Sequence, residues 1–381
     1  MRNLEENTPS HQARGAKKKV RYAIVGLGHL AQNAILPAFA HAGQNSALAA
    51  IISDDPVKLR AMGRQYGVDN CFSYEDYEWC LRSGEIDAVY VALPNNLHQN
   101  YCVRAAENGI HVLCEKPLAA TAEECQNIIK TCEQNHVKLM TAYRLHFERG
   151  NLEAIDIVRS GEIGEPRIFN SVFTMQVSQG NIRTKANYAG GTLYDIGIYC
   201  INAARYIFGD EPVEGFCLSA AGEDPRFQTV EEITSAILRF PGERLANFTA
   251  SFGAADTGDF EIVGTKGRLR AHQAYDYSLP MILEVKVGSH TQRKLYALRD
   301  QFAPELIYFS DCILHGREPE PSGLEGLRDV RIIQSLYESV RTKAPMKLEP
   351  IRRRQYPTLK QAIYRPRVAK PKLVHVTAPK R

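Results

Sequence analysis

The chain has 381 residues, which exceeds the length of one ordinary hydrophobic core and predicts two domains. Its 44% hydrophobic and 24% charged residues are usual for a globular protein, and no apolar run is long enough to span a membrane. The formal net charge of +4 is concentrated at the ends, because residues 351–381 hold ten Lys or Arg and no acid, and residues 1–19 are also basic. The stretch between the ends is therefore net acidic, which argues against nucleic-acid binding by the core.

The N-terminus and the cysteines indicate a reducing compartment. The first residues include Glu5 and Glu6 and lack the apolar segment and small-residue cleavage site of a secretory signal. The nine cysteines form no C-x-x-C pair, and most lie in apolar stretches, which predicts reduced, buried thiols. We therefore expect a cytoplasmic protein. The basic tail is interpreted as a solubilising extension or a segment that packs on an acidic subunit surface, with binding to an anionic partner as the alternative.

Residues 20–142 alternate regularly between strand-like and helix-like segments. Strands are predicted at 21–25, 47–53, 88–92, 111–114 and 138–142. Helices are predicted from the first glycine turn to about residue 42 and at 56–66, 74–83, 98–108 and 121–135. Thr121 and Glu124 have the spacing of a capping box at the start of the last helix. This alternation predicts an α/β Rossmann domain with a parallel sheet.

After Tyr143 the pattern becomes typical of an α+β domain. One helix to residue 160 is followed by strand-like segments at 167–176, 214–220, 233–240, 246–252, 259–263, 268–272 and 282–287. Further helices are predicted at 193–208, 305–314 and 324–341. We expect a large, mainly antiparallel open sheet in this domain. The predicted division is an N-terminal arm (1–19), a Rossmann dinucleotide-binding domain (20–142), a substrate and oligomerisation domain (143–350) and a basic tail (351–381).

The strongest single motif is the turn Gly26-Leu27-Gly28-His29-Leu30-Ala31, which follows the first strand and opens a helix. Gly26 and Gly28 allow a tight turn and close approach of a pyrophosphate, which the positive end of the helix attracts. Ala31 keeps the helix close to the strand. The alternative is a plain glycine turn in an α/β protein. In the context of a complete sheet, we predict that Gly26, Gly28, His29, Leu30 and Ala31 bind a dinucleotide.

The end of the second strand bears on the choice between NAD and NADP. Enzymes that prefer NAD usually place a carboxylate there for the adenosine ribose, whereas this chain has Ser53. Ser53 and Lys58 would suit a 2′-phosphate, because a hydroxyl and a cation both bind that group well. Asp54 and Asp55 weaken this inference, and Ser53 has an alternative role as N-cap of the next helix. NADP is the expected cofactor, with NAD less favoured.

Two later loops follow strands and should lie at the same edge of the sheet. They are Leu93-Pro94-Asn95-Asn96-Leu97-His98 and Cys114-Glu115-Lys116-Pro117. Ligands of a doubly wound sheet bind at the carboxyl ends of its strands, so both loops are expected to face the nicotinamide. Taken without the surrounding fold, Glu115 and Lys116 would be interpreted as a surface charge pair.

These motifs occur in the order and spacing of the Gfo/Idh/MocA oxidoreductases, and the chain resembles that family over about residues 20–350. Tyr143-Arg144 and the segment Gly190-Gly191-Thr192-Leu193-Tyr194-Asp195-Ile196-Gly197-Ile198-Tyr199 favour its sugar-oxidising branch. The resemblance implies cofactor contacts from Ser53, Lys58, Tyr74, Leu93, Pro94, Asn95, His98, Glu115, Lys116 and Arg144. It also implies substrate contacts from Lys116, Tyr143, Asp195 and Tyr199.

The catalytic residues implied by the resemblance also make physical sense. Asp195 and Tyr199 are four residues apart on a predicted helix, so they project from one face. A free phenol titrates near pH 10, and a nearby cation favours its phenolate form, here Lys116. Tyr199 would then remove a proton while Lys116 polarises and Asp195 orients the substrate. The alternatives are His98 as the base and Tyr199 as a core aromatic residue.

The expected function is an NADP-dependent sugar dehydrogenase that oxidises C1 of an aldopyranose to a lactone. The alternatives are a sugar-to-sugar oxidoreductase with tightly bound NADP and a non-catalytic nucleotide sensor. The sequence shows no H-E-x-x-H motif and no cluster of Cys and His, so no metal site is expected. The expected partners are a sugar substrate and further copies of the chain, as a homodimer or homotetramer formed through the C-terminal sheet, with no nucleic acid and no membrane.

Overall fold

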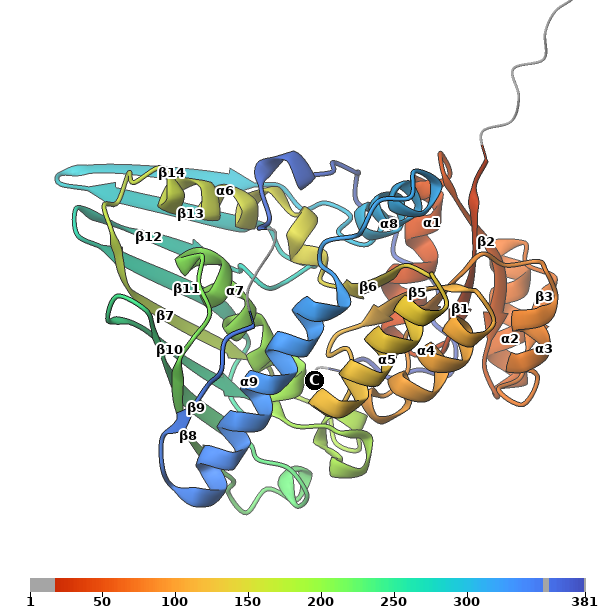
Figure 1. Ribbon diagram of the computed structural model, residues 1–381, viewed down its shortest axis with the longest axis horizontal. Coiled ribbons are helices and arrows are strands. Elements are labelled where there is room, and N and C mark those ends of the chain that lie inside the picture. The colour runs from red at the N-terminus through yellow and green to blue at the C-terminus, as the bar shows by residue number, and fades with distance from the viewer. Residues whose placement is uncertain (1–17, 352–355, 380–381) are drawn as a thin grey trace, which may run out of the picture.

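The computed structural model describes residues 18–351 and 356–379, which form two domains side by side (Figure 1). The first domain contains a six-stranded parallel sheet in the order β3-β2-β1-β4-β5-β6. Its strands are β1 (Val20–Val25), β2 (Ser46–Ile52), β3 (Asn70–Phe72), β4 (Ala88–Val91), β5 (His111–Glu115) and β6 (Leu139–Ala142). This strand order is that of a Rossmann fold, so the predicted fold class of the first domain is confirmed.

Helices cover both faces of this sheet, so its central strands are shielded from water on both sides. Accordingly, β1 and β4 are mostly apolar and almost wholly buried. The helices are α1 (Leu36–Ala42), α2 (Pro56–Tyr66), α3 (Tyr77–Arg82), α4 (His98–Glu107) and α5 (Ala122–Gln134). A π-helical turn, η1 (Ala31–Ile35), precedes α1. The capping box predicted at Thr121 and Glu124 is present at the start of α5. Strand β3 was not predicted, because it has only three residues.

The second domain is built on a nine-stranded sheet in the order β14-β13-β12-β11-β7-β10-β9-β8-β15. The strands are β7 (Pro166–Thr174), β8 (Glu214–Ala220), β9 (Ile233–Phe240), β10 (Arg244–Ser251), β11 (Thr257–Gly264), β12 (Gly267–His272), β13 (Met281–Val287), β14 (His290–Tyr296) and β15 (Met346–Lys347). All neighbouring pairs are antiparallel except β7 and β10, which run parallel. The large, mainly antiparallel sheet is therefore confirmed.

One parallel pair lies within this mainly antiparallel sheet. After β7 the chain passes through a helix and enters the sheet at β8, and two antiparallel connections then place β10 parallel to β7. The edge strands β14 and β15 were not predicted. In β14 every residue except Tyr296 is exposed and only Leu295 and Tyr296 are apolar, so it lacks the alternation of apolar and polar residues that marks a half-buried strand.

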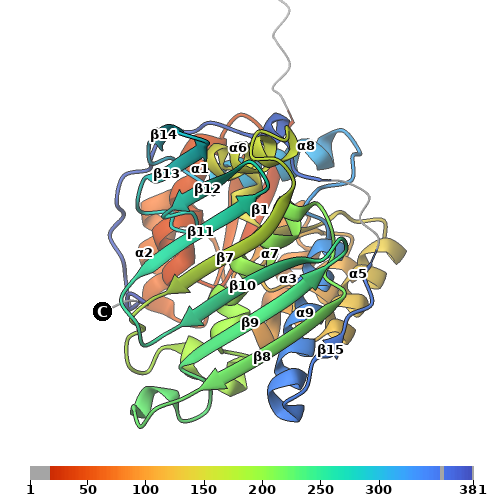
Figure 2. The ribbon, with the colours of Figure 1, turned by 90° about the vertical axis from the view of Figure 1, so that its left-hand side faces the viewer.

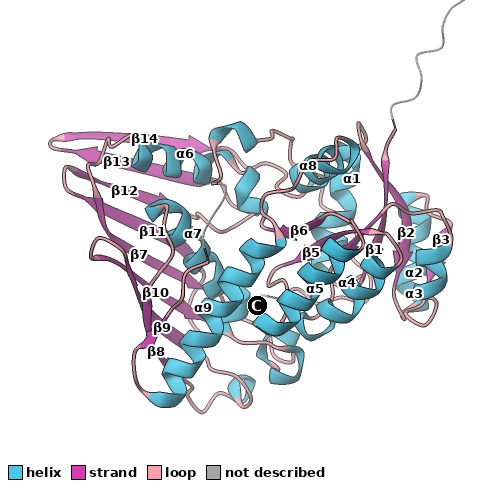
Figure 3. Ribbon diagram, in the orientation of Figure 1, coloured by secondary structure: helices cyan, strands magenta, loops and turns pink. Residues whose placement is uncertain are grey.

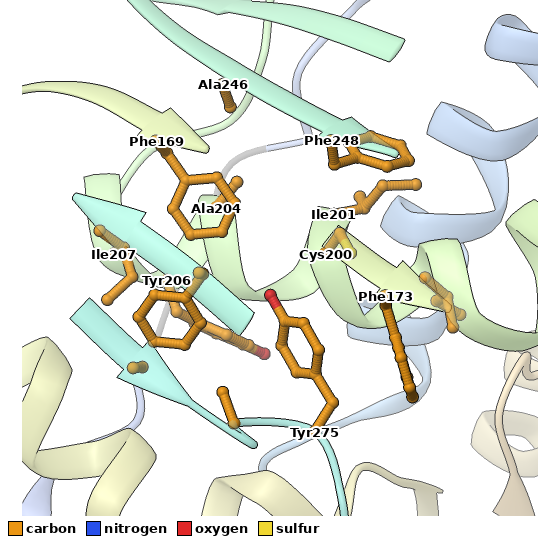
Figure 4. Close-up of a cluster of buried hydrophobic side chains, with 14 of the residues drawn as sticks. Phe169, Phe173, Cys200, Ile201, Ala204, Tyr206, Ile207, Ala246, Phe248 and Tyr275 are labelled. Carbon is orange, nitrogen blue, oxygen red and sulfur yellow. The ribbon is translucent and has the colours of Figure 1, made fainter. Parts of the chain in front are cut away.

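Helices cover one face of the large sheet and leave the other bare, as Figures 2 and 3 show. The helices that follow residue 143 are α6 (Arg149–Arg159), α7 (Ile198–Phe208), α8 (Ala303–Leu314) and α9 (Gly323–Thr342). Aromatic residues on the covered face, including Phe169, Phe173 and Phe248, pack around α7 (Figure 4). A π-helical turn, η6 (Leu193–Gly197), opens the helix that was predicted at 193–208. This core fixes α7 and therefore the position of the residues at its N-terminal end.

Helix α8 belongs to the core of the first domain although it comes late in the chain. Phe302, Leu306 and Phe309 lie in one buried cluster with Tyr22 and Ile24 of β1. The Tyr22 hydroxyl also bonds to the Ser310 hydroxyl at 2.8 Å. The two domains are therefore joined by packing as well as by the chain crossing at Tyr143.

Within the described part of the chain, no helix is both long enough and apolar enough to cross a membrane. The nine cysteines are all free thiols, and every one except the half-buried Cys71 is buried. Burial raises the pKa of the Cys200 thiol to about 12 and also raises the pKa of the Cys217 thiol to about 12, so these groups stay protonated. The interpretation of the cysteines as buried thiols is confirmed.

Candidate active site

The glycine turn after β1 has the shape that a pyrophosphate requires. Gly26 has a φ of +100°, and a Cβ there would lie 2.6 Å from the Ala92 carbonyl oxygen, so only glycine fits. At Gly28 a Cβ would meet no atom within 4 Å, which leaves open space beside the start of the helix. Leu30 is half-buried and Ala31 is buried against the sheet. The residues present therefore fit a dinucleotide phosphate group.

His29 follows this turn and is half-buried. Its pKa is lowered by burial and by the positive charge of Arg183 from the second domain. His29 is therefore a neutral donor or acceptor close to the boundary between the domains.

The residue that caps α2 is not the one considered in the sequence analysis. Asp55, not Ser53, is the N-cap of α2, because its carboxylate accepts hydrogen bonds from the backbone N–H of Val57 and Lys58. The alternative role of Ser53 as N-cap is therefore wrong. The Ser53 hydroxyl accepts instead from the Asp55 backbone N–H at 3.2 Å.

Asp54 is also engaged, since its carboxylate accepts from the backbone N–H of Tyr74 at 2.9 Å. The Tyr74 ring packs edge-on against Tyr101. Both acids that follow Ser53 are thus held by backbone donors. Ser53 and Lys58 remain as the polar groups at the adenosine end of the site.

His98 is a buried link between the two later loops. Its Nε2 lies 2.9 Å from the Leu93 carbonyl oxygen and its Nδ1 lies 2.8 Å from the Pro117 carbonyl oxygen. The side chain is fully buried, and burial lowers its pKa. Because both ring nitrogens face backbone oxygens, the geometry favours a positioning role for His98 over a role as the base.

Asn95, in the first of these loops, reaches the second domain. Its side-chain amide donates to the Ala189 carbonyl oxygen at 2.9 Å. Leu93 and Pro94 are half-buried beside it. The loop after β4 is therefore fixed on one side by His98 and on the other by the segment that precedes Gly190.

Glu115 is buried, and its partners are Tyr90 and the backbone of Lys116. Its carboxyl accepts from the Tyr90 hydroxyl at 2.8 Å and from the Lys116 backbone N–H at 3.2 Å. Burial raises the pKa of Glu115, and it also raises the pKa of Glu305, whose carboxyl lies 3.3 Å from the same Tyr90 hydroxyl. Glu115 thus supports the backbone of the loop that carries Lys116.

Lys116 extends from the first domain to the helix of the second. Its Nζ donates to the Asp195 carbonyl oxygen at 2.7 Å and to the Asp195 carboxylate at 3.2 Å. The same Nζ lies 5.0 Å from the centre of the Tyr199 ring. The structure therefore brings Lys116 together with Asp195 and Tyr199, which lie about 80 residues later in the sequence.

Arg183 was not identified from the sequence, although it completes the charge arrangement. Its Nε donates to the Asp195 carboxylate at 2.6 Å. Burial alone would raise the pKa of Asp195, but Arg183 and Lys116 together hold it below its ordinary value. The signal lies in Gly190, since a Cβ there would lie 2.4 Å from the Arg183 carbonyl oxygen. The glycine pair lets this loop fold back so that Arg183 reaches Asp195.

Arg144 is buried under Tyr199 and supplies a second cation. Its Nη2 lies 3.3 Å from the Tyr199 hydroxyl and donates to the Tyr275 carbonyl oxygen at 2.6 Å. Its Nη1 donates to the side chain of Gln301. Its guanidinium carbon lies 5.2 Å from the centre of the Tyr199 ring and 5.2 Å from that of Tyr277. Sequence reasoning missed Tyr277 and Gln301, which lie in segments without a recognisable motif.

Tyr143 lies apart from this group. Its hydroxyl donates to the Asp329 carboxylate of α9 at 2.5 Å, and the side chain is buried. Its ring contributes to a small cavity behind Tyr199, together with Asn202 and Phe260. The structure therefore shows Tyr143 as a contact between α9 and the base of the site.

The fold and the site define the class of this protein. A Rossmann domain with an open glycine turn holds a dinucleotide, and a lysine, an aspartate and a tyrosine meet at the carboxyl ends of its strands. Two family models match the chain: the oxidoreductase family with an NAD-binding Rossmann fold over residues 20–143, and the GFO/IDH/MocA C-terminal domain over residues 151–270. The chain belongs to the Gfo/Idh/MocA oxidoreductase family and is an NAD(P)-dependent oxidoreductase.

Several characterised proteins resemble the chain over most of their length. D-xylose 1-dehydrogenase [NADP(+)] of Haloarcula marismortui is 30% identical and is matched over 87% of this chain and 93% of its own. The crystal structure of aldose-aldose oxidoreductase from Caulobacter crescentus, complexed with glycerol, has 36% identity and a TM-score of 0.83, and the match covers 87% of this chain and 100% of that one. The 3-ketoreductase KijD10 from Actinomadura kijaniata, in complex with NADP and TDP-benzene, has 26% identity and a TM-score of 0.78, with coverage of 84% and 98%.

Proposed function

We propose that this chain is an NADP-dependent oxidoreductase that oxidises a sugar, with C1 of an aldopyranose as the reacting carbon and a lactone as the product. The observation that carries the proposal is the meeting of Lys116, Asp195 and Tyr199, with Arg144 beside the Tyr199 hydroxyl. One acid and several cations around a phenol suit the removal of a proton from a substrate hydroxyl.

The preference for NADP rests on the residues after β2. The carboxylates of Asp54 and Asp55 accept from backbone N–H groups. Ser53 and Lys58 are left to bind the 2′-phosphate, to which a hydroxyl and a cation are both suited. The similarity to an NADP-dependent xylose dehydrogenase and to a reductase solved with NADP supports this assignment.

Removal of the proton from the substrate hydroxyl is assigned to Tyr199. When bound, the cofactor provides a hydride acceptor at its nicotinamide ring. Lys116 and Arg144 both lie close to the Tyr199 ring, and the Tyr199 hydroxyl takes the proton of the C1 hydroxyl. Lys116 also donates to the sugar oxygen on which charge changes during the reaction.

Asp195 is assigned the role of orienting the sugar. Each of its carboxylate oxygens is bound by a cation, Lys116 on one and Arg183 on the other. A carboxylate oxygen can accept more than one hydrogen bond, so Asp195 can also accept from a sugar hydroxyl. Arg183 and Lys116 are thereby held on either side of the substrate position.

The second candidate function is transfer between two sugars, with the cofactor retained. It is favoured by the 36% identity to an aldose-aldose oxidoreductase over the whole of that chain. In this reaction one sugar is oxidised and a second is reduced at the same site.

The test is the absorbance of reduced nicotinamide when glucose, xylose or arabinose is added to the purified protein with NADP or NAD. Continuous formation of NADPH, with a slower reaction for NAD, is the expected result. Absence of reduction with every aldose, while the protein still binds NADP, would contradict the proposal and favour a nucleotide-sensing protein.

A further inference from the structure

The basic tail crosses from one domain to the other along the surface. Figure 2 shows the segment after β15 passing over the molecule and down the side on which α2 lies. Its early part is anchored on both domains: the Pro357 carbonyl accepts from Arg159 of α6, and Arg365 donates to the His41 carbonyl at the end of α1. Arg365 also donates to the Gln44 side chain at 2.6 Å.

Residues 371–379, which we call the strap, reach the glycine turn itself. The Val374 backbone N–H donates to the Gln32 side chain at 2.8 Å, and the Gln32 amide donates back to the Val374 carbonyl at 3.0 Å. Gln32 directly follows Ala31 and is fully buried. The Val374 side chain packs on the apolar core around α1. A reciprocal pair of hydrogen bonds therefore holds the strap beside the expected pyrophosphate position.

The strap then contacts the adenosine end and the second domain in turn. His375 Nδ1 lies 3.0 Å from the Asp55 carboxylate, two residues after Ser53. Ser178, which follows β7, donates its backbone N–H to the Pro379 carbonyl at 2.9 Å. The Ser178 hydroxyl also donates to the Ala378 carbonyl. Within six residues the strap thus joins the ends of β1 and β2 to the opposite domain.

These contact points flank the path that a bound dinucleotide would occupy. In a Rossmann domain the pyrophosphate lies at the turn after the first strand, and the adenosine ribose lies at the end of the second. Gln32 and Asp55 stand just beyond these two positions, and Ser178 stands on the facing domain. A segment fixed at all three points passes from the first domain to the second beside the expected cofactor position.

The charge of the strap suits the same ligand. From Ile351 to Arg381 the chain holds no acidic residue, and Lys370 and Lys372 lie just before the Gln32 contact. His375 pairs with Asp55, the acid that would otherwise repel a 2′-phosphate. A polyanionic dinucleotide is therefore attracted by the segment that covers it.

We propose that the strap covers the bound dinucleotide and slows its release. This inference rests on the proposed function. Because an oxidoreductase that exchanges its cofactor must release NADPH after each turnover, the strap then sets the rate of that step.

The test compares the full chain with a chain truncated after Lys370, by the rate at which each releases NADPH. Bound NADPH is followed by its fluorescence after mixing with excess NADP. The truncated chain loses the hydrogen bonds to Gln32 and Ser178 and the pair with Asp55, so release is expected to accelerate on the order of tenfold or more.

Point variants locate the effect within the strap. Val374→Pro removes the N–H that binds Gln32, and His375→Ala removes the partner of Asp55. Each is expected to accelerate release severalfold, while Thr377→Ala, at an exposed position of the same segment, leaves it unchanged.

Equal rates of NADPH release from the full and truncated chains would contradict the proposed role of the strap, even if both chains oxidise sugars. Faster release from the truncated chain, with no sugar oxidised by either form at saturating NADP, would instead support the strap and contradict the proposed function. If neither form binds NADPH, both proposals fail.

Discussion

At the residue scale, the site depends on one lysine that bridges two domains. Lys116 comes from the loop after β5. Asp195 lies in the π-helical turn η6, and Tyr199 lies in the first turn of α7. The position of Lys116 is fixed from behind, since Glu115 accepts from its backbone N–H and His98 bonds to the next residue, Pro117. Small changes in these supporting residues should therefore alter activity without touching the substrate.

Arg183 should set the pH at which Asp195 loses its charge. Because Arg183 and Lys116 hold the pKa of Asp195 below its ordinary value while burial pushes it up, Arg183→Gln is expected to raise this pKa. Asp195 would then become protonated at a higher pH, so the acidic limb of the kcat/KM profile should move to higher pH. The profile is measured with a buffer series and compared with Arg82→Gln, a change on the exposed face of α3. An unshifted limb would show that Arg183 does not act through Asp195.

The sequence allowed part of this site to be predicted and not the rest. Lys116, Asp195 and Tyr199 lie in motifs whose order and spacing are recognisable. Arg183 lies in a loop whose path depends on close contact at Gly190, which no local pattern reveals. Tyr143 was expected at the substrate, but its hydroxyl binds Asp329 of α9, and that partner is 186 residues away in the sequence.

At the element scale, α7 is held in place by a buried charge network. Arg205 is fully buried and binds Glu211, Glu325 and Asp329, two of which lie on α9. Tyr143 and Asn202 bind the same Asp329 carboxylate. The network fixes α7 to α9, and α7 carries Tyr199, so its integrity matters for the geometry of the site.

Arg205→Gln should therefore destabilise the protein strongly. Removing one partner of a buried ion pair leaves charges without compensation and costs about 3–5 kcal/mol. The free energy of unfolding from urea denaturation measures the loss. Arg341→Gln, which breaks an exposed pair with Glu338 at the end of α9, should cost far less, because water screens that pair. Similar losses in the two variants would contradict the assigned role of Arg205.

Element prediction succeeded for short segments with several apolar residues. β8 and β9 lie at the predicted residues and are of this kind. The polar edge strand β14 gave no such signal. The parallel pairing of β7 with β10 follows from the route of the chain between them and not from either strand's own sequence.

At the scale of the whole molecule, the bare face of the large sheet is the place where copies of the chain would meet. Apolar side chains on this face are unusually exposed, including Leu218 at 60% and Ile237 at 46%. Ile168, Val172 and Leu245 extend the same surface across neighbouring strands. Contiguous exposed apolar surface of this kind marks an interaction site.

We expect the protein to be a dimer or tetramer formed through this face. The double substitution Leu218→Glu and Ile237→Glu places like charges in the contact and should give monomers in light scattering. Leu279→Glu, at an exposed apolar residue outside the sheet, should leave the assembly unchanged. A monomeric parent protein, or a double variant of unchanged mass, would contradict this arrangement.

The proposed role of Lys116 is to donate to the substrate from the edge of the Rossmann sheet, and its most direct test is kcat/KM of Lys116→Ala with an aldose and NADP. We expect a loss of about 10²–10³-fold with little change in unfolding temperature, because a hydrogen-bond donor to an oxygen on which charge changes contributes on that order. Lys130→Ala, at an exposed position of α5, is the matched control and should react like the parent chain. Turnover by Lys116→Ala close to that of the control would contradict this role of Lys116.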